Sequence, residues 1–136
     1  MIELHGWVTI RETYEARFDE EDNIDIVVNK ISEEIERLLY FKPQIKAQNG
    51  TNYLEFSLFS NRENSQIQEA FKLYKRIGEL AAGSYGLMYL YDDEKEGKEN
   101  QFQVFFLARG LIRESDDIYL SPIVPVIEDE EFFTHM

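Results

Sequence analysis

Alternating apolar and polar positions at the start of the chain predict a β-strand with one buried face. The apolar positions are Ile2, Leu4, Val8 and Ile10, and the polar residues between and after them are Glu3, His5, Thr9 and Arg11. Successive side chains of a strand point to opposite faces, so this period of two places the apolar residues on one side.

Apolar residues spaced three and four apart predict two helices. The acidic run 19–22 suits the N-terminus of the first, because the helix dipole favours negative charge there, and Pro43 stops it. Its apolar stripe is Ile24, Val27, Val28, Ile31, Ile35, Leu38 and Leu39. The second helix follows Ser60–Glu63, which has the form of a capping box, and continues to Ala82-Gly83. Its stripe is Ile67, Phe71, Tyr74, Ile77 and Leu80.

Four more extended segments complete the pattern. Gln44–Gln48 and Thr51–Phe59 flank Asn49-Gly50, a strong signal for a type I′ hairpin. Strands at Ser84–Tyr91 and Phe102–Ala108 flank a charged loop, Asp92–Asn100. After Arg109-Gly110, Pro122 and Pro125 exclude a helix and predict an extended segment on the surface or at a sheet edge.

The order of these elements, β-α-β-β-α-β-β, predicts an α+β fold. We expect a single, mainly antiparallel sheet with both helices on one face, in which a ferredoxin-like core carries an added edge strand. The 136 residues are enough for one domain, residues 1–136, with one core.

The charge of the chain limits its partners. It has 14 Lys and Arg against 27 Asp and Glu, a net charge of −13, which repels nucleic acid and anionic membranes and favours basic partners. Alternatively, the acidity only keeps the protein soluble. With no cysteine, no secretion signal and no long apolar run, we expect a cytoplasmic protein. Because a net charge of −13 disfavours self-contact, we expect a monomer when free, with pairing through an exposed edge strand as the alternative.

Candidate catalytic chemistry is sparse. The two histidines, His5 and His135, have no evident orienting acid, and no nucleophile elbow, phosphate-binding loop or spaced set of metal-binding acids occurs. We therefore predict no catalytic residues, no cofactor and no metal. Two interpretations compete with a protein-binding role. One is a small-ligand or regulatory domain that uses an open sheet face, which a pocket with convergent polar groups under the helices would support. The other is a hydrolase whose paired carboxylates are buried together.

The sequence allows two positions for its aromatic residues, in the core or on the open face of the sheet. At least one of the sets Phe56/Leu58 and Phe102/Val104/Phe106 should pack under the helices. Tyr85, Leu87, Tyr89 and Tyr91 share one strand face. That row lies either on the open face of the sheet, where tyrosine offers a large contact area, or in the core.

Several motifs resemble the immunity protein 7 family of bacterial polymorphic toxin systems. They occur in the family's order over nearly the whole chain: His5-Gly6-Trp7, Gly83–Leu87 running into Tyr91–Glu94, Leu107–Gly110, Asp117–Pro122 and Pro125–Asp129. Ile123-Val124 stands where the family often carries a cysteine, so no role of a thiol transfers.

This resemblance implies a non-enzymatic protein that binds one cognate toxin domain and blocks it, with a basic nuclease as the expected toxin. A basic cleft favours acidic contacts, and a buried aromatic side chain would anchor the interface. The candidate partner-binding residues are Asp92, Asp93, Glu94, Asp116, Asp117, Glu128, Asp129, Trp7, Tyr89 and Tyr91. Alternatively, Arg109 pairs with one of these acids inside the fold.

Overall fold

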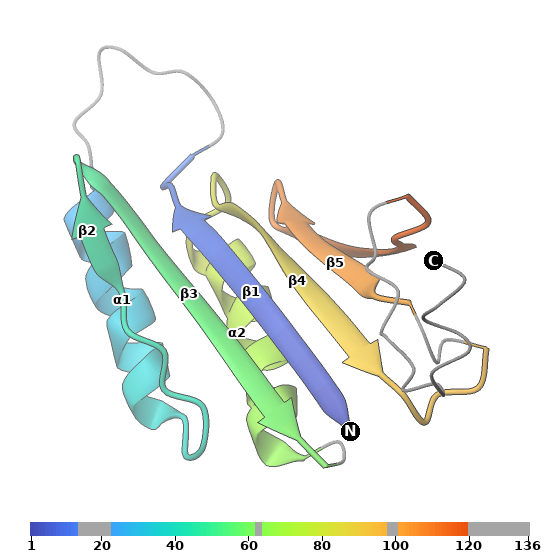
Figure 1. The fold of residues 1–136 in the computed structure, drawn as a ribbon. Helices are drawn as coiled ribbons and strands as arrows, with labels where there is room; N and C mark the ends of the chain where they lie inside the picture. The colour runs from blue at the N-terminus through green and yellow to red at the C-terminus, as the bar shows by residue number, and fades with distance from the viewer. Residues whose placement is uncertain (14–22, 62–63, 98–100, 120–136) are drawn as a thin grey trace, which may run out of the picture.

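A six-stranded antiparallel sheet carries two helices on one of its faces (Figure 1). This computed structural model describes residues 1–13, 23–61, 64–97 and 101–119. The described elements are β1 (Ile2–Ile10), α1 (Ile24–Arg37), β2 (Lys46–Gln48), β3 (Thr51–Ser60), α2 (Ser65–Leu80), β4 (Tyr85–Asp92), β5 (Gln103–Ala108) and β6 (Leu111–Asp116).

The strand order β2-β3-β1-β4-β5-β6 confirms the predicted fold class. Its first four strands, joined through α1 and α2, form the ferredoxin-like core, and β5 extends it as expected. The sheet continues one strand further, because β6 pairs with β5 along its whole length. Arg109 and Gly110 connect these two strands with φ values of 51° and 76°. This pair of left-handed residues makes the tight turn that converts the predicted extended edge segment into a paired strand.

The first hairpin forms as its sequence predicts. Asn49 and Gly50 have φ values of 53° and 76°, and they set the register of β2 against β3, in which Gln48 lies opposite Thr51. Positive φ at both central residues is the requirement of a type I′ turn, which asparagine and glycine meet at little cost.

The helix ends differ from the prediction in two places. The first helix ends at Arg37, and Leu39 is 75% exposed rather than part of the apolar stripe. Leu38 already has an extended backbone with ψ of 147°, so the chain leaves the helix well before Pro43. Ser60 remains in β3, and Asn64 caps α2 instead: its side chain accepts a hydrogen bond from the Ile67 N–H at 3.2 Å. The acidic run 19–22 lies outside the described residues.

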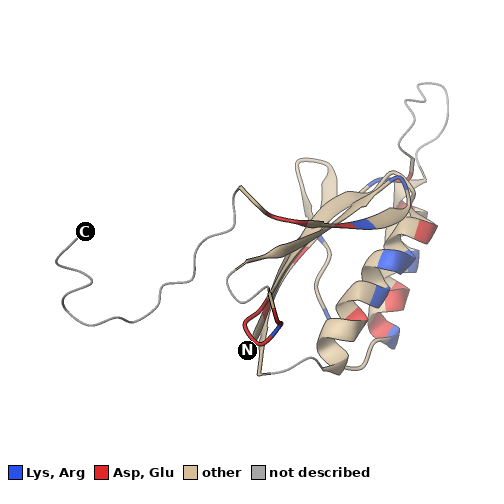
Figure 2. Ribbon diagram, turned by 90° about the vertical axis from the view of Figure 1, so that its right-hand side faces the viewer, with Lys and Arg blue, Asp and Glu red and all other residues tan. Residues whose placement is uncertain are grey.

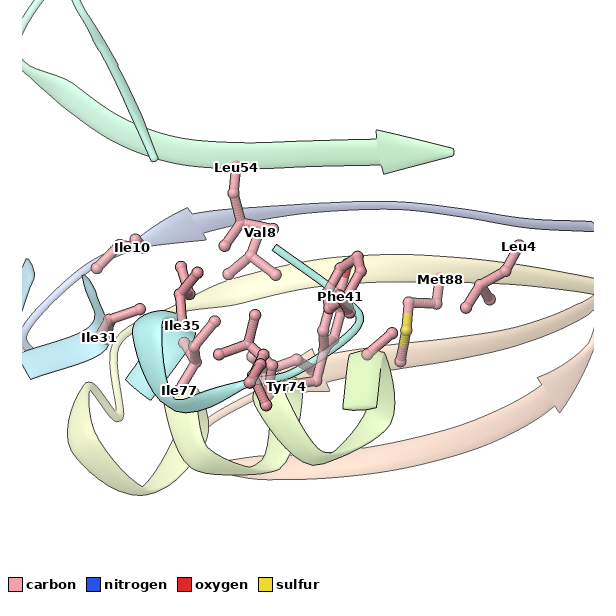
Figure 3. Packing of buried hydrophobic residues seen from close by; sticks show 14 of the residues in the cluster. Leu4, Val8, Ile10, Ile31, Ile35, Phe41, Leu54, Tyr74, Ile77 and Met88 are labelled. Atoms are coloured by element: carbon pink, nitrogen blue, oxygen red, sulfur yellow. The ribbon is translucent and has the colours of Figure 1, made fainter. Parts of the chain in front are cut away.

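The core lies between the sheet and the helices (Figure 3). Even-numbered residues of β1, β3 and β4 point toward the helices, among them Leu4, Val8, Leu54 and Met88, all completely buried. They meet Ile31 of α1 and Ile77 of α2, which are also completely buried. Phe56 and Leu58 pack against this core, so one of the two aromatic sets lies under the helices as expected.

Tyr74 connects α2 directly to the backbone of the sheet. Its hydroxyl lies 3.1 Å from the carbonyl oxygen of Trp7 and 2.9 Å from that of Leu87, and it donates its proton between them. Burial raises the pKa of the Tyr74 phenol, and the hydrogen bond to Trp7 acts against this rise. Gly6 leaves the room for this contact, because a Cβ there would lie 2.6 Å from the Phe56 ring and would also press on the Tyr74 hydroxyl.

Candidate functional site

The face of the sheet opposite the helices is rich in aromatic side chains. Odd-numbered residues of β1, β3 and β4 point to this open face, as the register and the burial pattern show. Tyr85, Leu87, Tyr89 and Tyr91 therefore lie on the face away from the helices, so the core placement is wrong for Tyr85 and Tyr89, whereas Tyr91 is buried on this face. Met88, between two of these tyrosines, is completely buried on the other face.

The three predicted aromatic contact residues differ in accessibility. Trp7 is 37% exposed, and its ring meets that of Tyr85 edge to face at 6.0 Å between centroids. Tyr89 is partly buried and contacts Phe102 at 6.3 Å. Tyr91 is only 4% exposed, with Phe102 tilted against it at 5.6 Å. Trp7 thus offers the most surface of the three, and Tyr85, 43% exposed, adds a neighbour that shares the tyrosine row.

His5 is held in a polar network at the centre of the open face. Its Nδ1 lies 2.8 Å from the Ser57 hydroxyl, and its Nε2 lies 3.1 Å from a carboxylate oxygen of Glu3. Its ring also packs edge to face against Phe59. Both ring nitrogens are therefore engaged within the chain, which fixes the orientation of the imidazole.

A shallow hollow of about 400 Å³ opens beside His5. Its polar and aromatic lining comes from His5 and Trp7 of β1, Glu55 and Ser57 of β3, and Tyr89 of β4. A second hollow, of about 250 Å³, lies between α1 and α2 and is lined by charged residues such as Glu34, Lys72 and Arg76. Neither hollow lies between the helices and the sheet, where a pocket would have supported the small-ligand interpretation.

An acidic turn follows β4, near the N-terminus of the chain (Figure 2). A carboxylate oxygen of Asp92 accepts the N–H of Glu94 at 3.0 Å, which shapes the turn. Asp93 forms an ion pair with the Met1 amine, and this hydrogen bond raises the pKa of the amine while burial acts against the rise. Asp93 and Glu94 are exposed, so these carboxylates face solvent rather than each other in a buried pair.

The second acidic segment lies at the same end of the sheet. Asp116 is opposite Gln103, which is in turn opposite Leu90, two residues before Asp92. Asp117 follows directly, and its N–H donates to the Phe102 carbonyl at 3.2 Å. Arg109 lies in the β5–β6 turn, at the opposite end of β5 from Asp116. Glu128 and Asp129 are outside the described residues.

Two further features, a metal-binding cluster and a membrane-spanning helix, are not found among the described residues. Among the residues that the structure describes, no group of three or more His, Asp or Glu side chains is arranged to hold a metal ion. In the same part of the chain, no helix is both long enough and apolar enough to cross a membrane.

These features define a class: an acidic two-layer α+β protein with a ferredoxin-like core, an uncovered aromatic sheet face and an acidic end. The family model described as Immunity protein 7 matches residues 1–129, so the chain belongs to the immunity protein 7 family. Membership implies protection against a toxin, and immunity proteins generally act without catalysis. No curated protein and no solved structure matches the chain.

Proposed function

We propose that this protein neutralises a cognate, basic toxin domain of the nuclease type by forming a stoichiometric complex with it. The observation that carries the proposal is the placement of two acidic segments, Asp92–Glu94 and Asp116-Asp117, toward the same end of the sheet, with β5 between them, in a member of this family. The binding surface includes this acidic end together with the aromatic residues of the open face.

Electrostatics supports this partner class. A nuclease must bind phosphate, so its cleft is basic, and a chain with a net charge of −13 is attracted to it. Complementary charge raises association rates to about 10⁸–10⁹ M⁻¹s⁻¹ at low salt. Nuclease–immunity protein pairs are among the tightest complexes known, which shows that this physics suffices for inhibition.

Co-expression with the candidate toxin tests the proposal. The chain is expressed with the C-terminal domain of a large secreted protein encoded beside it, and the pair is examined by size-exclusion chromatography, calorimetry and a toxicity assay. We expect a one-to-one complex of nanomolar affinity or tighter that abolishes toxicity. The absence of both complex and protection would refute the proposal for that toxin, and a toxin without nuclease activity would refute the nuclease assignment.

A paired charge reversal then tests the acidic end. Asp93→Lys with Glu94→Lys should slow association and weaken its salt dependence, because long-range attraction is lost. Glu33→Lys with Glu36→Lys is the matched control, since both of these exposed acids lie on α1 in the helical layer. Equal slowing by the two double variants would show that only the total charge matters and that the acidic end is not a contact.

A further inference from the structure

The hollow beside His5 has a combination of groups that the fold itself does not require. Trp7 lies directly opposite Glu55 on β3, and Tyr89 lies directly opposite His5 on β4. Trp7 and Tyr89 are therefore diagonal neighbours across the β1–β4 pair, and both line the hollow together with Glu55. The described residues place both helices on the other face, so these side chains are not there to fill the core.

The floor of the hollow is rigid. Gly6 lies beneath it, and the Tyr74 hydroxyl holds the Trp7 carbonyl from the other side of the sheet at 3.1 Å. His5 is fixed by Ser57 and Glu3. A site whose backbone and polar groups are already in place loses little conformational freedom when a partner binds.

We propose that this hollow receives an arginine side chain of the toxin domain. This inference rests on the proposed function and names the contact that would give it specificity. A guanidinium group stacks on the faces of tryptophan and tyrosine, and its planar fork binds a carboxylate through two hydrogen bonds. Trp7 and Tyr89 supply the aromatic walls, and Glu55 supplies the carboxylate.

Lys46 of β2, which is not among the residues that line the hollow, pairs with the same carboxylate in the free protein. Its ammonium group lies 3.2 Å from a Glu55 carboxylate oxygen, and the two side chains are 47% and 57% exposed. An ion pair this exposed contributes little to stability and exchanges readily. The toxin arginine displaces Lys46, because the two cationic side chains compete for the carboxylate of Glu55.

This competition predicts opposite effects of two variants on the affinity for the toxin domain. Glu55→Gln should raise Kd by about tenfold or more, because a cation enclosed in the interface loses its charged partner. Lys46→Gln should lower Kd by about two- to fivefold, because the carboxylate is then free of its internal partner. Glu33→Gln and Lys30→Gln change the same charges on exposed positions of α1 and should leave Kd within about twofold.

Trp7 provides a second, uncharged test. Trp7→Leu keeps an apolar side chain but removes the aromatic face and should raise Kd by about thirtyfold, while Trp7→Phe keeps a smaller ring and should raise it less. Far-ultraviolet circular dichroism and urea unfolding check that each variant is folded.

A double-mutant cycle identifies the partner side chain. Each arginine on the basic face of the toxin is changed to alanine, and its coupling to Glu55→Gln is measured by calorimetry at moderate and high salt. We expect one arginine to couple at least fivefold at both salt concentrations. If wild-type protein binds and protects but no arginine couples and Trp7→Leu binds normally, the inference is wrong and the proposed function stands. If wild-type protein does not bind, the proposed function itself fails.

Discussion

The two faces of the sheet are formed by the same strands, but their side chains differ in burial. On the helix-covered face of β1, Leu4 and Val8 are completely buried, whereas Trp7, on the other face of the same strand, is 37% exposed. Hydrophobic burial accounts for the covered residues. It does not account for Trp7 and Tyr85 on the open face, whose large rings are kept in contact with solvent. This difference separates residues that hold the fold from residues that are available to a partner.

Substitutions on one strand would give the largest contrast between the faces. Leu54 and Phe59 both belong to β3, but Leu54 is completely buried and Phe59 is 61% exposed. Leu54→Ala should lower the free energy of unfolding by about 2–5 kcal/mol, through lost burial and a cavity. Phe59→Ala should lower it by about 0.5 kcal/mol. Urea unfolding measures both, and equal losses would mean that the open face is as much part of the core as the covered face.

A substitution at Gly6 tests how tightly the side chains on the helix-covered face are packed. Gly6→Ala would push a methyl group into the Phe56 ring and the Tyr74 hydroxyl, and we expect a loss of about 1–3 kcal/mol from overpacking. Ser57→Ala, on the open face, is the comparison and should cost less, since it removes only the hydrogen bond with His5. Midpoints of urea unfolding that rank the two variants in the reverse order would contradict this view of Gly6.

The Tyr74 hydroxyl is the polar link between the two layers. Tyr74→Phe keeps the ring in the core but leaves the carbonyl oxygens of Trp7 and Leu87 without this donor. We expect the free energy of unfolding to fall by about 1–2 kcal/mol. Since the ring and its burial are unchanged, a loss as large as that of Leu54→Ala would show that the hydroxyl organises the sheet beyond one hydrogen bond.

Leu39 and Tyr40 are exceptions to the burial of large apolar side chains in the helical layer, because they are 75% and 61% exposed. Glu69 holds this segment by accepting hydrogen bonds from the N–H groups of Leu39, Tyr40 and Phe41 at 2.8–2.9 Å. Burial opposes ionisation of Glu69, but these three bonds outweigh it and hold the pKa of the carboxyl below its ordinary value of 4.5.

Removing this carboxylate should give a small effect that depends on pH. Glu69→Ala should lower the free energy of unfolding by about 1 kcal/mol at pH 7, similar to the loss of a helix cap. Because the folded state lowers the pKa, the contribution is complete above pH 4.5 and disappears as the pH falls through the lower, folded value. Urea unfolding of both proteins at several pH values measures this, and a difference that grows toward acid pH would contradict it.

The sequence predicts the fold where local chemistry and tertiary packing agree. Asn49-Gly50 gives its hairpin because both residues tolerate positive φ, and the period of two in β1 identifies its buried face. The β5–β6 turn was missed because arginine gives no signal for the left-handed conformation that Arg109 adopts. The capping box at Ser60 failed because β3 continues through that residue.

The candidate site is harder to predict from the sequence than the fold is. Periodicity groups the tyrosines of β4 on one face but does not say whether helices cover it. Nor does it bring Glu55 of β3 next to Trp7 of β1, since that contact depends on strand register. The acidic segments are recognisable in the sequence, but their placement toward the same end of the sheet follows only from the β4–β5–β6 pairing.

The residue-by-residue alternation of β1 also sets the kinds of genetic change that the protein can tolerate. A point substitution at an odd position alters what the open face presents and leaves the even, buried positions untouched. An insertion or deletion of a single residue within the strand would exchange the two sets and turn Trp7 toward the helices. Changes that preserve this fold are therefore exchanges of side chains within the strands, whereas changes in length belong in the loops.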